Sequence, residues 1–304
     1  AVLLGMGGSS LGPEVLAQTF GARAGFPELL VLDSTDPAQI RRIEAQIDPA
    51  RTLFVVSSKS GSTLEPDVLH RHFFALVAAA VGEGPAPAHF VAVTDPNSDL
   101  DEQAKAGGFR WVFHGDPQIG GRYSGLSNFG MVPAALIGLD IGAFSYASQA
   151  MVRSCGPSVP PTANPAAVLG MTLAEAAKSG RNKVCILASD GIADLGAWLE
   201  QLLAESTGKG GKGLIPVAAD PLGPARAYSA DRIFVRIRLE GAAEPALDET
   251  ICALKGLGHP VIEIVLSAPE TLGQEFFRWE LAIAIVGAAI GLNPFDQPDG
   301  EASK

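Results

Sequence analysis

The chain has 304 residues, of which 47% are hydrophobic and 18% charged. This composition is typical of a packed globular protein with room for two ordinary domains. With 33 acidic and 22 basic residues the formal net charge is −11, so the overall field repels nucleic acid and anionic membranes. We therefore expect no nucleic-acid or membrane partner, and any anionic ligand must be captured by local donors.

The three cysteines, Cys155, Cys185 and Cys252, are widely spaced and form no CxxC motif, so we expect neither metal nor disulfide chemistry. No signal peptide is visible, and the longest late apolar run, 281–292, is too short to span a bilayer. We expect a cytoplasmic protein. The chain begins within a strand pattern, Ala1–Leu4, and lacks an initiator Met, which indicates a fragment or a processed piece.

Strand-like and helix-like segments alternate along the first half of the chain. Helices are predicted to begin at Pro13 and at Asp36-Pro37, and a longer helix to cover Leu64–Val81. The short apolar runs between them are typical of a parallel sheet covered by helices. The strands are expected over Ala1–Leu4, Leu29–Leu32, Leu53–Val56, Phe90–Val93 and Trp111–Phe113.

The same alternation resumes after a Pro-rich stretch at 156–165, which is the best candidate linker. Strands are expected over Lys183–Ala188, Ile215–Val217, Arg232–Val235 and Val261–Val265, and helices over Asp194–Ser206, Ala246–Leu257 and Glu270–Leu292. The pattern predicts an α/β protein of two doubly wound, mainly parallel, flavodoxin-like domains, residues 1–155 and 156–304.

The most informative segment follows the third strand and precedes the Leu64–Val81 helix. It reads Ser58-Lys59-Ser60-Gly61-Ser62-Thr63. Four hydroxyls and a glycine at such a junction surround one point with O–H and N–H donors, and the helix N-terminus adds partial positive charge. This segment is therefore predicted to hold a phosphate.

A second glycine-rich turn, 5–12, follows the first strand and allows two interpretations. It is close to the dinucleotide pattern GxGxxG, with Asp33 in the place of a ribose-binding acid, but Ser10 stands where the third glycine belongs. A dinucleotide site has no need of the hydroxyl-rich turn after the third strand. Two such loops at the carboxyl ends of neighbouring strands favour one small phosphate, such as that of a sugar phosphate.

At this point the sequence resembles the sugar isomerase (SIS) domain and, further along, the glucose-6-phosphate isomerase family. Three motifs in family order carry the likeness over nearly the whole chain: Gly120-Gly121-Arg122-Tyr123-Ser124, the segment from Gln201 to Lys209, and Asn293-Pro294-Phe295-Asp296-Gln297-Pro298 with Lys304. The strand at the very start and the compact C-terminal half also resemble the isomerase part of fused transaldolase–glucose-6-phosphate isomerases.

The resemblance implies reversible isomerisation of glucose 6-phosphate and fructose 6-phosphate through an enediolate, without cofactor or metal, in a homodimer. In this family Glu205 would be the base, Gln201 would orient the substrate, Arg122 would stabilise the enediolate, and Lys304 would assist ring opening. A guanidinium suits the role of Arg122 because it does not lose its proton. The residues implied for the phosphate are Gly8, Ser9, Ser58, Ser60 and Thr63, together with the backbone N–H of Lys59.

One feature departs from the family pattern, and two further functions stay open. The family supplies a ring-opening histidine after the catalytic glutamate, but no histidine occurs here between Glu205 and His259. Another group must then open the ring, or the enzyme works slowly or on open-chain sugar. A dual phosphoglucose/phosphomannose isomerase is one alternative, with Thr207 as the residue beside the base. A non-catalytic SIS module that binds a sugar phosphate is the other.

Overall fold

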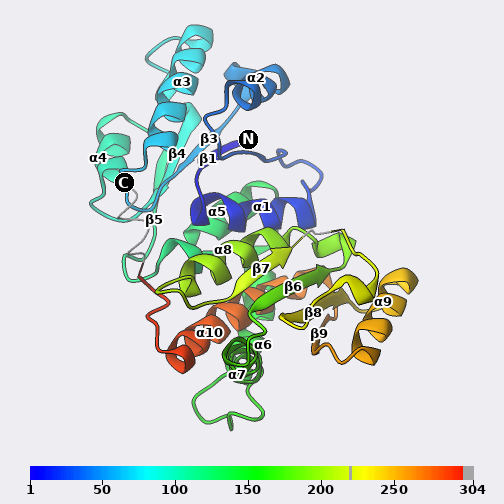
Figure 1. Ribbon diagram of the computed structural model, residues 1–304. Helices are drawn as coiled ribbons and strands as arrows, with labels where there is room; N and C mark the ends of the chain where they lie inside the picture. The colour runs from blue at the N-terminus through cyan, green and yellow to red at the C-terminus, as the bar shows by residue number, and fades with distance from the viewer. Residues whose placement is uncertain (219–220, 297–304) are drawn as a thin grey trace. The chain divides into compact units, whose positions relative to one another are not determined.

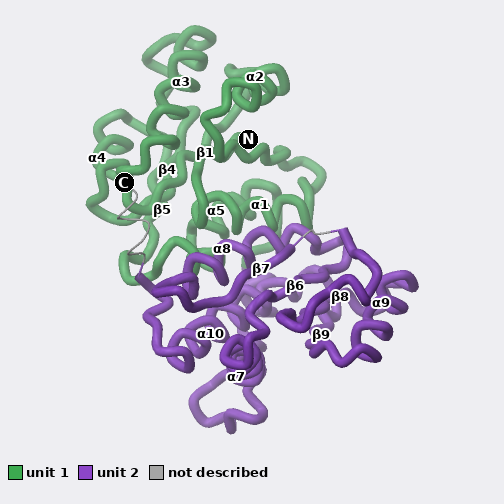
Figure 2. The backbone as a smooth tube through the Cα atoms, viewed as in Figure 1, with its two compact units in different colours: residues 1–141 green, residues 142–304 purple. Residues whose placement is uncertain are grey.

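The computed structural model describes residues 1–218 and 221–296. It divides into two compact units, 1–141 and 142–304, which Figure 2 shows in different colours. The sequence placed the boundary after residue 155, whereas the structure assigns nearly all of helix α6 (Ile141–Ser154) to the second unit. The reason is packing: a Cβ on Gly273 of α10 would lie 1.9 Å from Ser148 Oγ and 2.9 Å from the Phe144 ring.

Unit 1 is built on one parallel sheet of strand order β2-β1-β3-β4-β5 (Figure 1). Its strands are β1 (Val2–Gly5), β2 (Leu30–Leu32), β3 (Phe54–Ser57), β4 (Phe90–Thr94) and β5 (Trp111–His114). Its helices are α1 (Gly8–Phe20), α2 (Pro37–Gln46), α3 (Leu64–Val81), α4 (Asp99–Ala106) and α5 (Asn128–Leu136), with short 3-10 turns at Pro49–Arg51, Ala86–His89 and Gly121–Tyr123.

Both faces of the unit 1 sheet are buried, as its strands with apolar residues on both sides predict. On one face Phe54 and Phe90 pack against Phe73 of α3 and Leu100 of α4. On the other face the alternate strand residues, among them Val93, pack against α5. Since β1 and β3 are neighbours with Gly5 opposite Ser57, the loops that follow these two strands leave the sheet side by side.

Unit 2 repeats this plan with a parallel sheet of order β7-β6-β8-β9. Its strands are β6 (Lys183–Ala188), β7 (Ile215–Ala218), β8 (Arg232–Leu239) and β9 (Val261–Leu266). Besides α6 its helices are α7 (Pro165–Lys178), α8 (Leu195–Thr207), α9 (Pro245–Gly256) and α10 (Leu272–Ile290), with 3-10 turns at Asp190–Ile192, Ala225–Ala227 and Pro269–Thr271.

Helices cover the unit 2 sheet as well. Ile251 and Leu254 of α9 pack on the face that carries Cys185 and Phe234, and the strand residues that alternate with these are also buried. Helices α8 and α10 meet through Trp198 and Phe276, whose ring centroids are 4.6 Å apart. The doubly wound, parallel fold class predicted from the sequence is confirmed in both units, and every predicted strand is present.

The start of the first helix was predicted wrongly. The sequence placed it at Pro13, but α1 begins at Gly8 and contains Pro13. Gly7 takes a positive φ of 54°, which turns the chain directly from β1 into the helix. The glycine- and serine-rich segment is therefore largely the first turn of α1 and not a separate loop. Among the described residues no helix is both long and apolar enough to cross a membrane.

Helix α10 carries a buried carboxyl group. Glu275 is 1% exposed, and its side chain lies 3.2 Å from that of Arg278 one turn later. Burial raises the pKa of Glu275 to about 7, and the charge of Arg278 only partly opposes this. The folded protein therefore binds this proton more tightly than the unfolded chain does.

This difference predicts that stability falls as the pH rises from about 4.5 to about 7. The Glu275→Gln variant keeps the shape without the charge, so its loss of unfolding free energy between pH 5 and pH 8 should be smaller by up to about 3 kcal/mol. Urea unfolding at the two pH values measures this. The exposed Glu270→Gln serves as the control, and equal pH slopes for Glu275→Gln and the parent chain would contradict the assignment.

Candidate active site

The hydroxyl-rich loop, Ser58 to Thr63, connects β3 to α3. Ser58 is 3% exposed and donates from its Oγ to Thr63 Oγ1 at 3.3 Å. Ser60 Oγ accepts from the N–H and from the hydroxyl of Ser62, at 3.3 and 3.0 Å. Thr63 immediately precedes α3 as its N-cap residue. The loop thus leads a run of hydroxyl-bearing residues into the N-terminus of a helix, a position that favours anions.

Two contacts hold this loop in place. Gly61 has φ +71°, and a Cβ there would lie 2.5 Å from the backbone nitrogen of Leu100, so glycine is required. Lys59 Nζ donates to Asp95 Oδ2 at 2.5 Å and to the Asp116 carbonyl at 2.8 Å. The ammonium group of Lys59 therefore serves the loop's own structure, which leaves its backbone N–H as the part assigned to a ligand.

The first turn of α1 lies directly against the Gly120-Gly121-Arg122 segment. A Cβ on Gly8 would lie 2.2 Å from the Gly121 carbonyl oxygen and 2.9 Å from the backbone nitrogen of Arg122. Ser9 is 7% exposed and Arg122 only 2%. The backbone of a buried arginine is thereby held next to the first glycine turn. Unit 1 alone therefore brings together the two phosphate loops and the predicted arginine.

The remaining predicted side chains that are described stand on α8 in unit 2. Gln201 and Glu205 are one turn apart and so lie on the same side of the helix. Gln201 Oε1 is buried and has no hydrogen-bond partner among the described residues, so it is an acceptor that a ligand hydroxyl can satisfy. Lys304, predicted to assist ring opening, lies outside the described residues.

Lys209 is a structural residue that the sequence analysis did not single out. Its Nζ donates to the carbonyl of Asn293 at 2.6 Å, and to the carbonyl and the Oδ1 of Asp296 at 2.6 and 2.5 Å. Two of the three motifs that carried the family resemblance are thus tied together at the end of α8. Lys209 belongs to the motif that begins at Gln201, and its acceptors belong to the motif that begins at Asn293. Neither motif alone predicts that the two segments are in contact.

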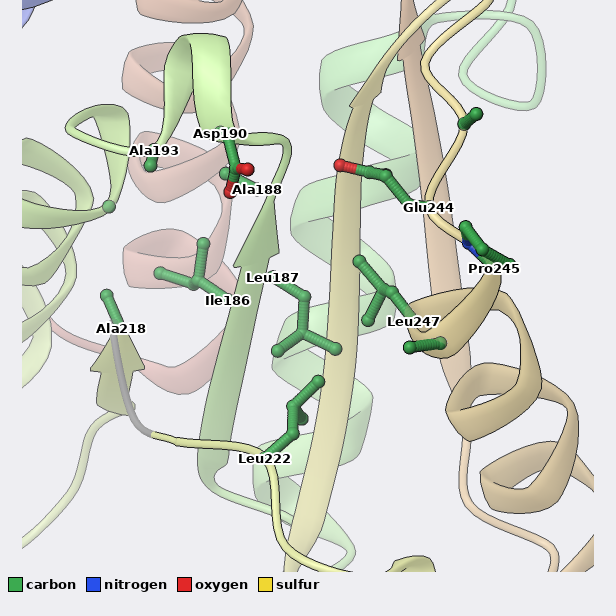
Figure 3. A pocket seen from close by; sticks show the side chains of 13 residues that line it. Ile186, Leu187, Ala188, Asp190, Ala193, Ala218, Leu222, Glu244, Pro245 and Leu247 are labelled. Carbon is green, nitrogen blue, oxygen red and sulfur yellow. The ribbon is translucent and has the colours of Figure 1, made fainter.

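A cavity of about 510 Å³ lies at the carboxyl edge of the unit 2 sheet. Strand β6 lies between β7 and β8 as β1 lies between β2 and β3, so this cavity occupies the topological position of the phosphate loops in unit 1. Figure 3 shows the aliphatic side chains of Ile186 and Leu187 on β6, with those of Leu222 and Leu247 nearby, and Asp190 and Glu244 above them. Glu244 is paired with Arg236 at 3.2 Å, but the exposed Asp190 adds an opposing negative charge here, so of these two equivalent positions the one in unit 1 suits a phosphate better.

The described residues contain no group of three or more His, Cys, Asp or Glu side chains arranged to hold a metal ion.

Comparison with known proteins agrees with this geometry. The profile of the family described as phosphoglucose isomerase matches residues 1–213. The glucose-6-phosphate isomerase of Rubrobacter xylanophilus is 30% identical over 351 aligned residues, which cover all of this chain and 80% of the relative. That of a Synechococcus strain is 35% identical over 213 residues, covering 68% of this chain and 39% of the relative.

A hypothetical protein of Thermus thermophilus has the same fold, with a TM-score of 0.89 and 26% identity over 99% of this chain and 81% of that one. The profile match covers both unit 1 phosphate loops, Arg122, Gln201 and Glu205. From these matches, the chain belongs to the phosphoglucose isomerase family.

Proposed function

We propose that this chain catalyses the reversible isomerisation of glucose 6-phosphate and fructose 6-phosphate. The observation that carries the proposal is the close packing of Gly8 against the backbone of Gly121 and Arg122, because it fixes a buried arginine residue beside the turn predicted to bind phosphate. A phosphate cradle alone fits any sugar-phosphate binder. An adjacent fixed cation also stabilises the oxyanion that develops during isomerisation.

In the proposed mechanism the substrate phosphate is anchored by Ser58, Ser60 and Thr63, by Gly8 and Ser9, and by the Lys59 backbone N–H. Glu205 removes the proton from C2 of the open-chain aldose and returns it to C1, passing through an enediolate. Arg122 stabilises the negative charge on the enediolate oxygens. Gln201 accepts a hydrogen bond from a substrate hydroxyl, and Lys304 is proposed to assist opening of the sugar ring.

The family relationship supports three further proposals about the working protein. It acts in the cytoplasm, on a small sugar phosphate, and as a homodimer. Exposed apolar side chains offer surface for a second copy: Tyr146 (71%) and Val152 (43%) on α6, and Val168 (47%) and Met171 (44%) on α7.

The homodimer proposal predicts that sedimentation equilibrium gives the mass of two chains. Replacing Val168 and Met171 together with glutamate should shift the measured mass toward that of one chain, because it places charge on this apolar surface.

The role of Glu205 predicts that Glu205→Gln lowers kcat for fructose 6-phosphate by about 10²- to 10⁴-fold, because the amide cannot take up a proton. Binding of the substrate should persist, as titration calorimetry would show. The exposed Glu249→Gln on α9 is the matched control. A Glu205→Gln variant with unchanged kcat would remove this residue from the mechanism, whereas a parent chain that binds without turnover would indicate a sugar-phosphate-binding module.

The phosphate cradle predicts a different kinetic signature. Replacing Ser58 and Thr63 together with alanine removes two donors to a dianion, so kcat/KM should fall by about tenfold or more, mostly through KM. Ser154→Ala, on the exposed side of α6, controls for loss of a hydroxyl elsewhere. If the double variant keeps the parent KM, the phosphate is anchored at another place.

Measuring isomerase turnover with mannose 6-phosphate as the substrate tests the dual-specificity alternative. Thr207, the residue that suggested it, is fully buried. Its Oγ1 donates to the Leu203 carbonyl at 2.7 Å and accepts from the Leu214 N–H at 2.8 Å. This hydroxyl is therefore engaged in holding the end of α8, and the structure supplies no reason for it to select a second substrate.

A further inference from the structure

A second pocket, of about 300 Å³ and lined partly by polar side chains, lies at the amino edge of the unit 2 sheet. Arg181 precedes β6, Ala230 precedes β8 and His259 precedes β9, and parallel strands place these three segments at one edge. The lining residues also include Arg226, Tyr228 and Leu257. We call this the amino-edge pocket. None of its residues takes part in the proposed mechanism.

The pocket is cationic although the chain carries a net charge of −11. Arg181 Nη1 donates to the Ala230 carbonyl at 2.7 Å, which fixes that guanidinium at the rim. Arg226 is exposed, and no hydrogen bond or ion pair holds its guanidinium within the described residues. His259 Nδ1 is buried and likewise lacks a hydrogen-bond partner there.

The nearby acid does not cancel this charge. Asp231 accepts from Lys183 Nζ and from Ser229 Oγ, each at 2.5 Å. The hydrogen bond from Lys183 is the largest cause that lowers the pKa of Asp231 to about 2. Because this carboxylate is already paired with Lys183, the charges of Arg181 and Arg226 remain uncompensated at the pocket.

One wall of the pocket is apolar and rigid. Tyr228 meets the Phe234 ring edge-on at 5.2 Å, and its hydroxyl accepts from the Gly223 N–H at 3.0 Å. The Arg232 guanidinium lies 5.5 Å from the centroid of the Tyr228 ring and so adds positive charge beside that ring. Leu257 is 59% exposed at the rim, which leaves an apolar surface beside the two arginines.

We propose that the amino-edge pocket binds a phosphate monoester with a small apolar or ring-shaped body. Two guanidinium groups match the charge and the planar fork geometry that phosphate oxygens accept. The imidazole of His259 offers a further polar contact, and Tyr228 and Leu257 pack against the body of the ester. A volume of about 300 Å³ admits a small ligand, at the lower end of the usual range.

The test uses phenyl phosphate as the probe and amide NMR spectra of the 304-residue chain. The amides of Tyr228 and Gly258 report on the amino-edge pocket, and that of Gly61 reports on the cradle in unit 1. Arg226→Gln should weaken the affinity seen at Tyr228 and Gly258 by about tenfold while leaving that seen at Gly61 unchanged. Arg153→Gln, an exposed arginine on α6 of the same unit, should change neither.

Four binding results would contradict the proposed site. Phenyl phosphate that shifts only the Gly61 amide, or an Arg226→Gln variant that binds as the parent does, would overturn the site. Benzoate binding as tightly as phenyl phosphate would overturn the preference for phosphate. Inorganic phosphate binding equally well would overturn the role of the Tyr228 and Leu257 surface.

Discussion

The close approach of Gly8 to Gly121 is the contact on which the candidate site depends. Because there is no room for a Cβ at Gly8, the backbone at the start of α1 is in direct contact with the backbone of the loop after β5. This sets Arg122 beside the first phosphate turn. The neighbouring strands β1 and β3 bring the second turn to the same edge, since Gly5 lies opposite Ser57. A larger residue at position 8 would push the start of α1 away from the Gly121-Arg122 backbone.

The two units show how one topology carries different chemistry. Their central strands have equivalent neighbours, and in each the loops after two adjacent strands leave the sheet together. In unit 1 those loops carry hydroxyls, glycines and the nearby Arg122. In unit 2 the equivalent position carries Asp190 and Glu244 around an aliphatic cavity. The fold supplies a place for a ligand, and the side chains decide its charge.

At both proposed ligand sites of this acidic protein, local groups matter more than overall charge. Lys59 is paired with Asp95, so the proposed cradle has hydroxyls, backbone N–H groups and the helix N-terminus as its donors. In the amino-edge pocket of unit 2, Arg181 and Arg226 remain without a compensating carboxylate. Short-range donors act within hydrogen-bond distance, where screening by salt and the distant acidic surface matter little.

The fold class, the strands, the hydroxyl-rich loop and the candidate residues were all predictable from the amino-acid pattern, because strand patterns and turn chemistry are local signals. Three features were not predictable in this way: α1 begins at Gly8 against Gly121, α6 packs with unit 2 through Phe144 and Ser148, and Lys209 binds Asn293 and Asp296. These depend on contacts between residues far apart in the chain. Such contacts leave no periodic trace in either segment, so they become visible only once the backbone is folded.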